Sequence, residues 1–249
     1  KVSRYGELQW TNSGKPVCVA TGHQYNPRLI SDGQGGAIVV WQDRRNNTDY
    51  NIYAQRLNYD GVPQWGVQGV VVCSSVYDQF NAQIVTDGTG GAIIAWHDYS
   101  AGNGFIDIYA QRISSDGHIL WSPANGVAIC NAVNNQTNLQ MIPDGFNGAI
   151  LTWQDRRASS RDDIYAQKIN SSGNKLWDIN GIPVSTISGY KYFPQLASDQ
   201  AGGAIITWQD NRNGTDYNIY AQSVSFEGDV NWDVNGTPVC TAGGQQYYP

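Results

Sequence analysis

The chain has 249 residues, of which 41% are hydrophobic and only 14% are charged, and its formal net charge is −6. A chain this acidic lacks the basic patch that a phosphate backbone requires, which excludes nucleic acid as the main partner. No apolar run approaches 18 residues, which argues against membrane insertion. Glycine, asparagine and aromatic residues replace the missing charged ones, as is typical of a turn-rich β protein that is secreted or displayed at the cell surface.

The N-terminal segment resembles only the last part of a unit that recurs later in the chain. GELQWTNSGKPVC near the start aligns with GVPQWGVQGVVVC about 55 residues further on. We therefore predict that residues 1–27 are an orphan fourth strand. One domain of four blades follows, at about 28–82, 83–138, 139–193 and 194–249.

The first complete unit predicts four short strands. Three of them are predicted at residues 26–32 (NPRLISD), 36–43 (GAIVVWQD) and 51–57 (NIYAQRL). The fourth runs from QW to GVVVC at residues 64–73. These segments are β-branched and aromatic, are bounded by Asp-Gly turn signals and have no helical period. Short antiparallel strands joined by tight turns are therefore expected.

The unit then repeats at a nearly constant interval. GGAIVVWQD returns as GGAIIAWHD, NGAILTWQD and GGAIITWQD, and the second residue of each word, a glycine, recurs at steps of 55, 57 and 55 residues. Four antiparallel strands in about 56 residues are typical of one propeller blade. We predict an all-β propeller with four complete blades and an orphan N-terminal strand. Five-bladed closure needs three more strands, either from a longer parent chain or from a neighbouring copy in a filament.

The repeated words resemble those of a known group of proteins. SDGQGGAIVVWQD, DIYAQR and NGVAIC are similar to the repeats of large secreted bacterial β-propeller proteins, which often carry a C-terminal secretion-sorting domain. The resemblance covers nearly the whole chain and implies a propeller fold and export. It marks function only weakly.

Two series of equivalent residues are candidate ligand-binding groups. Tryptophans near the start of the fourth strands can stack on sugars, and polar residues of the first strands line the central channel of a propeller. The first series is Trp10, Trp65, Trp121, Trp177 and Trp232, and the second is Arg28, Gln83, Gln140 and Gln195. Water is the alternative occupant of the channel.

A third series consists of aspartates that open the variable loops, namely Asp43, Asp98, Asp155 and Asp210. The loops close at Asn51, Asp107, Asp163 and Asn218, so oxygen-bearing side chains face one another and calcium is a candidate ligand. Arginines beside three of the four aspartates favour salt bridges instead. No cofactor is therefore predicted, with calcium as the alternative.

No residue cluster marks a catalytic site. The three histidines occupy different repeat positions, and His97 stands where the other repeats have glutamine. No Ser/His/Asp constellation or metal-spaced motif is present, and the acid–base pair of a glycosidase is not apparent. We predict a non-enzymatic extracellular propeller, a structural or adhesive module whose partners are copies of itself or neighbouring domains of a longer parent. A carbohydrate-binding, lectin-like propeller with glycan partners is the alternative.

Overall fold

The computed structural model describes residues 1–99, 104–158 and 160–249, and its strands form four antiparallel four-stranded sheets. The strands are β1 (Gln24–Ser31), β2 (Ala37–Asp43), β3 (Asn51–Leu57), β4 (Val70–Cys73), β5 (Gln79–Thr86), β6 (Ala92–Asp98), β7 (Asp107–Ile113), β8 (Val127–Cys130), β9 (Gln136–Pro143), β10 (Ala149–Asp155), β11 (Asp163–Ile169), β12 (Ile182–Ser185), β13 (Lys191–Ser198), β14 (Ala204–Asp210), β15 (Asn218–Val224) and β16 (Thr237–Cys240). Each sheet takes its strands in sequence order, and we number the sheets as blades 1 to 4. The predicted all-β propeller with four complete blades is confirmed.

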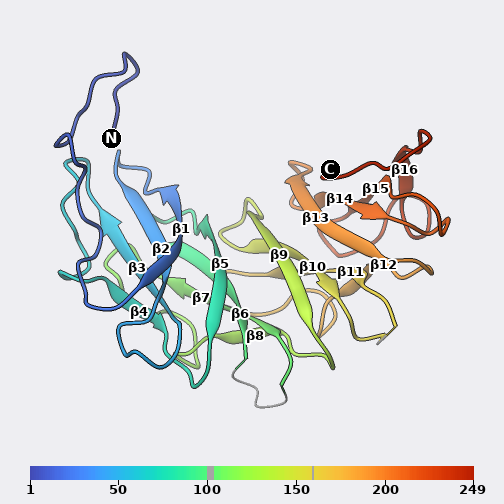
Figure 1. Ribbon diagram of the computed structural model, residues 1–249, viewed down its shortest axis with the longest axis horizontal. Coiled ribbons are helices and arrows are strands. Elements are labelled where there is room, and N and C mark those ends of the chain that lie inside the picture. Colours follow the sequence, from blue (N-terminus) through green and yellow to red (C-terminus); the bar gives the residue numbers. More distant parts are fainter. Residues whose placement is uncertain (100–103, 159) are drawn as a thin grey trace.

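The blades follow one another around an open arc (Figure 1). The first strand of each blade (β1, β5, β9 and β13) lies on the inner side of the arc, and the fourth strand lies outside. Blades 1 and 4 stand on opposite sides of the opening. Among the described residues, no helix is long and apolar enough to cross a membrane.

The repeated word is explained by the turn between the first and second strands. The Asp32 carboxylate accepts the backbone N–H groups of Gln34 and Gly36, both at 2.8 Å, and so closes the turn. A Cβ atom at Gly36 would collide with the carbonyl oxygen of Leu57, so only glycine fits there. The equivalent glycines of the other blades meet the same obstacle. Each blade therefore needs its own copy of the word.

The hydrophobic core is divided among the blade interfaces. Three clusters of buried side chains lie between blades 1 and 2, 2 and 3, and 3 and 4. Each contains aliphatic residues of the central strands and the tryptophan two residues before the end of a second strand, such as Trp96 or Trp153, both fully buried. Burial of apolar surface between neighbouring sheets therefore holds each blade to the next.

Tryptophans before the fourth strands add a polar link between blades. The indole N–H of Trp65 donates to the Ser115 carbonyl at 2.9 Å, and that of Trp121 donates to the Ser171 carbonyl at 3.0 Å. Trp10 makes the same bond to Tyr59 of blade 1, at 3.2 Å. The N-terminal segment therefore packs on blade 1 as the last part of each blade packs on the next one.

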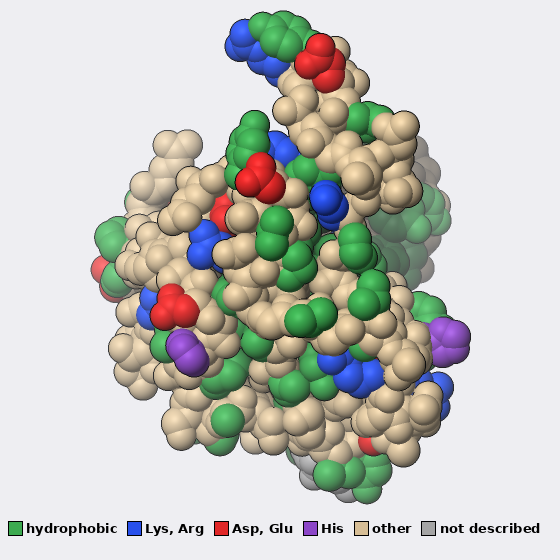
Figure 2. Space-filling view, turned by 90° about the vertical axis from the view of Figure 1, so that its left-hand side faces the viewer, with side chains coloured by type: hydrophobic (Ala, Val, Ile, Leu, Met, Phe, Trp, Pro, Cys, Tyr) green, Lys and Arg blue, Asp and Glu red, His purple; other side chains and the backbone are tan. Residues whose placement is uncertain are grey.

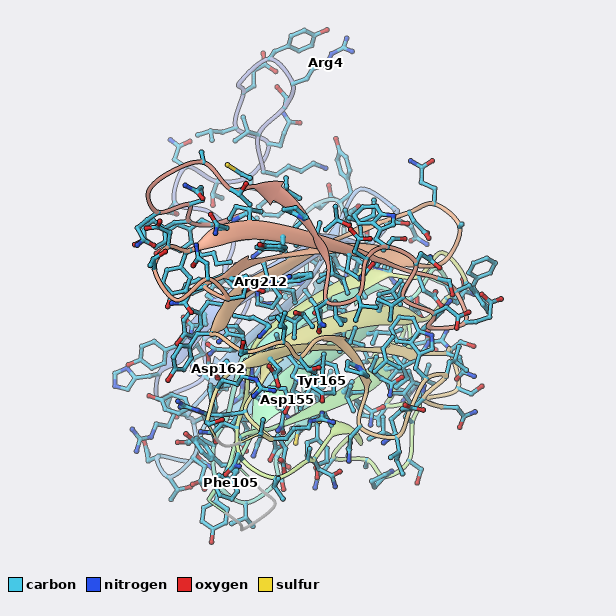
Figure 3. All side chains as sticks on the ribbon, turned by 90° about the vertical axis from the view of Figure 1, so that its right-hand side faces the viewer. Arg4, Phe105, Asp155, Asp162, Tyr165 and Arg212 are labelled. Carbon is cyan, nitrogen blue, oxygen red and sulfur yellow. The ribbon has the colours of Figure 1, made fainter. Side chains whose placement is uncertain are left out.

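The N-terminal segment also changes the outline of the molecule. Its first residues project from the body at the top of Figure 2, with Arg4 in the projecting part in Figure 3. Charged side chains of both signs are scattered over the face shown in Figure 2.

Candidate functional site

The first strands bulge where they face the inside of the arc. β1, β5, β9 and β13 each carry a register shift, and the residue at the bulge has a positive φ, between 49° and 53°. In blades 1 to 3 this residue is Asn26, Asn81 or Asn138. Asparagine tolerates left-handed backbone better than most residues, so the sequence can form the bulge with little strain.

The bulges of blades 1 to 3 line a central pocket with a volume of about 470 Å³. Its lining consists mostly of amide, guanidinium and imidazole groups: Asn26, Pro27, Arg28, Asn81, Ala82, Gln83, His97, Asn138, Leu139 and Gln140. Arg28, Gln83 and Gln140 belong to the predicted polar series, whereas Gln195, the fourth member, is not part of the lining. Ligand binding by this series remains a prediction.

One buried side chain in the lining interrupts the repeat. In blade 1, the Gln42 side-chain oxygen accepts the Asn26 amide at 2.6 Å and the backbone N–H of Asn81 in blade 2 at 3.2 Å. Gln154 of blade 3 bonds in the same way to Asn138 and to the backbone of Phe193. In blade 2 this position is His97, and neither of its ring nitrogens has a hydrogen-bond partner among the described residues.

Burial determines the charge of this histidine. His97 is 3% exposed and lies beside the Phe80 ring, with 5.4 Å between ring centroids. Because burial disfavours the imidazolium form, the pKa of His97 falls to about 4. At neutral pH the ring is uncharged, so it can donate from one nitrogen and accept at the other.

The predicted loop aspartates of blades 1, 3 and 4 form ion pairs with arginine. Asp43 accepts the Trp41 indole N–H at 2.8 Å and pairs with Arg45 at 2.6 Å, and that guanidinium lies over the Tyr53 ring. Burial opposes ionisation of Asp43, but the bonds from Arg45 and Trp41 outweigh it and lower its pKa. Asp155 and Asp210 have the same partners in their own blades, and Figure 3 shows Asp155 beside Tyr165. In these blades an arginine already supplies the positive charge that a metal ion would bring.

Blade 2 differs at this position too. Asp98 accepts the Trp96 indole N–H at 2.9 Å, but the residue two positions later is Ser100 instead of arginine. Asp107 stands opposite Asp98, and among the described residues neither of its carboxylate oxygens has a hydrogen-bond partner. Burial and the charge of Asp98 raise the pKa of Asp107 to about 6.

The predicted tryptophan series divides into buried and exposed members. Trp65, Trp121 and Trp177 are 3%, 5% and 8% exposed, so their rings offer little surface for stacking on a sugar. Trp232 is 43% exposed, and Trp10 is half-buried. The structure thus brings together three of the four polar first-strand residues in one pocket, and it places Trp65, Trp121 and Trp177 in three separate blade interfaces.

Asn26, Asn81 and Asn138 line the pocket but were not predicted from the sequence. They line the pocket because each occupies a bulge, and nothing in the sequence fixes a bulge within a β-strand. An asparagine recurring at the same position of three repeats was the available signal, because asparagine is enriched at left-handed backbone positions.

The chain is similar to solved structures by its fold. It matches an α-L-arabinanase from Penicillium chrysogenum, solved with arabinobiose, with a TM-score of 0.57, 12% identity, and 92% of this chain and 72% of that chain covered. It also matches an α-L-arabinofuranosidase from Fusarium graminearum, solved with an iminosugar inhibitor, with a TM-score of 0.50, 10% identity, and coverages of 91% and 71%. A Dyadobacter fermentans protein of unknown function matches with a TM-score of 0.50, 11% identity, and coverages of 85% and 69%. No protein-family model and no curated protein matches the sequence.

These similarities contradict two predictions from the sequence. The chain was predicted to be a non-enzymatic structural or adhesive module, yet two of the matched propellers are enzymes that act on glycosides. The alternative of a lectin-like propeller, which relied on analogy of fold, is not retained either. At this level of identity the similarity establishes the fold, and function has to be argued from the site.

Proposed function

We propose that this protein is a carbohydrate-active propeller of the glycoside hydrolase kind, and that its central pocket binds the glycan. The observation that carries the proposal is the pocket itself, with several amide groups and the buried His97, whose ring nitrogens have no partner in the part of the chain that the structure describes. The fold similarity to an α-L-arabinanase supports the substrate class.

The chemistry of the lining suits sugar hydroxyl groups. Each hydroxyl both donates and accepts a hydrogen bond, and so does each side-chain amide of Asn81, Gln83 and Gln140. Neutral His97 has the same dual capacity. Arg28 adds donors alone. A pocket with several convergent polar groups is typical of a small-ligand site, and its volume of about 470 Å³ lies within the usual range.

The residues that line the pocket can explain binding of a glycan better than they can explain cleavage of a glycosidic bond. Glycoside hydrolysis normally needs a carboxylic acid and a carboxylate on either side of the scissile bond. Among the ten lining residues none has a carboxyl group. We therefore assign substrate binding to the pocket, and we expect the catalytic carboxylates to lie outside these ten residues.

Titration with arabino-oligosaccharides, combined with an assay for released reducing sugar, tests the proposal. Gln140→Ala removes one lining amide and is expected to weaken binding about tenfold, the effect of losing one good hydrogen bond to the ligand. Gln195→Ala is the matched control, because Gln195 has the same repeat position but lies outside the lining. If the wild-type protein neither binds nor cleaves arabino- or xylo-oligosaccharides, the proposal is wrong. An equal loss in both variants would place binding outside the pocket.

A further inference from the structure

Two carboxylates of blade 2 lie buried and directly opposite each other. Asp98 ends β6 and Asp107 begins β7, the two are paired across the sheet, and their exposures are 1% and 0%. Side chains at directly opposite positions of an antiparallel pair have Cβ atoms about 4.5–5.5 Å apart. Like charges at that separation, away from water, are destabilising unless a positive charge compensates them.

Blade 3 shows how the same pair is compensated. Asp155 pairs with Arg157 at 2.5 Å, and Asp163 pairs with Arg161 at 2.9 Å. The ammonium group of Lys191, a fully buried residue of β13, lies 3.3 Å from Asp163. Two carboxylates are thus matched by three cationic side chains.

Blade 2 has none of these three cations. The equivalent residues are Ser100, Phe105 and Gln136, and Ser100 lies outside the described residues. Blades 1 and 4 have no second carboxylate to repel the first, because Asn51 and Asn218 replace the second aspartate. Blade 2 therefore combines two carboxylates with no equivalent of the compensating side chains.

Gln136 of β9, in the neighbouring blade, has the repeat position that Lys191 has in β13. Its side-chain N–H donates to the carbonyls of Ala132 at 3.3 Å and Asn134 at 2.9 Å, just as the Lys191 ammonium donates to two carbonyls at the equivalent positions. Its backbone N–H donates to Ile106, the residue before Asp107, at 2.8 Å. The side-chain oxygen of Gln136 is buried and has no hydrogen-bond partner among the described residues.

We propose that blade 2 binds a divalent cation, with Ca²⁺ as the natural candidate, between the paired carboxylates of Asp98 and Asp107. The ligands from the chain are the carboxylates of Asp98 and Asp107 and the side-chain oxygen of Gln136. All are hard oxygen donors, as Ca²⁺ requires, and water completes the coordination shell. Two positive charges match the two carboxylates. The described residues contain no group of three carboxylate, histidine or cysteine ligands, and here the third ligand is an amide.

Terbium luminescence tests the site directly, because Tb³⁺ replaces Ca²⁺ at oxygen sites and is sensitised by a nearby tryptophan. The Trp96 indole is bonded to Asp98, so excitation of tryptophan is expected to give saturable Tb³⁺ emission that Ca²⁺ displaces. Asp107→Asn, which installs the residue found in blades 1 and 4, is expected to abolish the emission. Asp60→Asn removes the same charge from an exposed turn and is expected to leave the emission unchanged.

Thermal unfolding supplies a second readout. At 100 times its Kd, Ca²⁺ is expected to raise the melting temperature of the wild-type protein by about 5 °C or more relative to EDTA. Gln136→Lys, which copies Lys191, is expected to unfold at a higher temperature than wild type in EDTA and to lose the response to Ca²⁺. The proposal is overturned if wild-type protein shows neither emission nor a Ca²⁺ shift, since the two carboxylates then share a proton instead. It is also overturned if Asp107→Asn retains the emission.

Discussion

Blades 2 and 3 share strand order, register and packing. They differ in the hydrogen bonds and ion pairs formed by side chains at equivalent polar positions. Blade 3 links Gln154 to its neighbours through hydrogen bonds and surrounds its two aspartates with arginine and lysine. In blade 2, His97 has no hydrogen-bond partner among the described residues, and the aspartate pair lacks the equivalents of those cations. Blade 3 thus pairs these positions with hydrogen bonds and cations, whereas in blade 2 the His97 ring nitrogens and the Asp107 carboxylate oxygens have no hydrogen-bond partner among the described residues. In a repeat protein, a blade that departs from the others is the natural place for a function that is needed only once.

The largest effect is expected from removing Arg157 of blade 3, a cation that has no equivalent in blade 2. Arg157→Ala leaves the buried Asp155 without its ion pair and removes the stacking on Tyr165. We expect a loss of about 4 kcal/mol in the free energy of unfolding, within the range for breaking one side of a buried pair. Urea denaturation measures it, with Arg156→Ala as the exposed control, for which about 0.5 kcal/mol or less is expected. Equal losses in the two variants would show that the pair contributes nothing.

A second variant makes the pocket of blade 2 resemble that of blade 3. His97 has a pKa of about 4 in the fold, below the ordinary value of 6.5, so the unfolded chain binds the proton first as the pH falls. The stability associated with neutral His97 is therefore complete above pH 6.5 and is lost as the pH falls towards 4, by about 3 kcal/mol in total.

His97→Gln removes that dependence and restores the residue of the other blades. Urea denaturation of both proteins at pH 7, 5.5 and 4 is expected to show the wild type losing about 3 kcal/mol relative to the variant. All other titrating groups are common to the two proteins, so their contributions cancel in the difference. Parallel stability curves would mean that His97 is not held neutral by burial.

The smallest effect comes from exchanging Lys191 for the glutamine of blade 2. Lys191→Gln keeps an amide donor for the two nearby carbonyls but removes the ammonium beside Asp163. Because Arg161 still pairs with Asp163, we expect a loss of only about 2 kcal/mol, measured by urea denaturation. Gln136→Lys, in EDTA, is expected to shift stability in the opposite direction. Shifts of the same sign would show that the two blades do not differ in charge compensation.

The constant spacing of the repeat made the architecture predictable. Turn aspartates, glycines and buried tryptophans recur at fixed intervals, and each has one structural role per blade. The replacement of glutamine by His97 was visible as well. The sequence did not show that His97 has no hydrogen-bond partner among residues 1–99, 104–158 and 160–249, because the groups that bond to the equivalent glutamines belong to strands of two different blades.

The prediction of a non-enzymatic module was wrong for a different reason. At 12% identity, the similarity to an arabinanase is a property of the fold that no motif in the chain reveals. The asparagines of the pocket were missed because a bulge re-aims a side chain, and their recurrence at one repeat position, which indicates left-handed backbone, was not used.

A crystal structure of the protein grown with an arabino-oligosaccharide and Ca²⁺ tests most directly the claim that blade 2 is the functional departure from the repeat. We expect sugar density in the central pocket, in contact with His97 and Gln140, and a cation between Asp98 and Asp107. Sugar bound only at the exposed Trp232, with water alone beside Asp107, would contradict it.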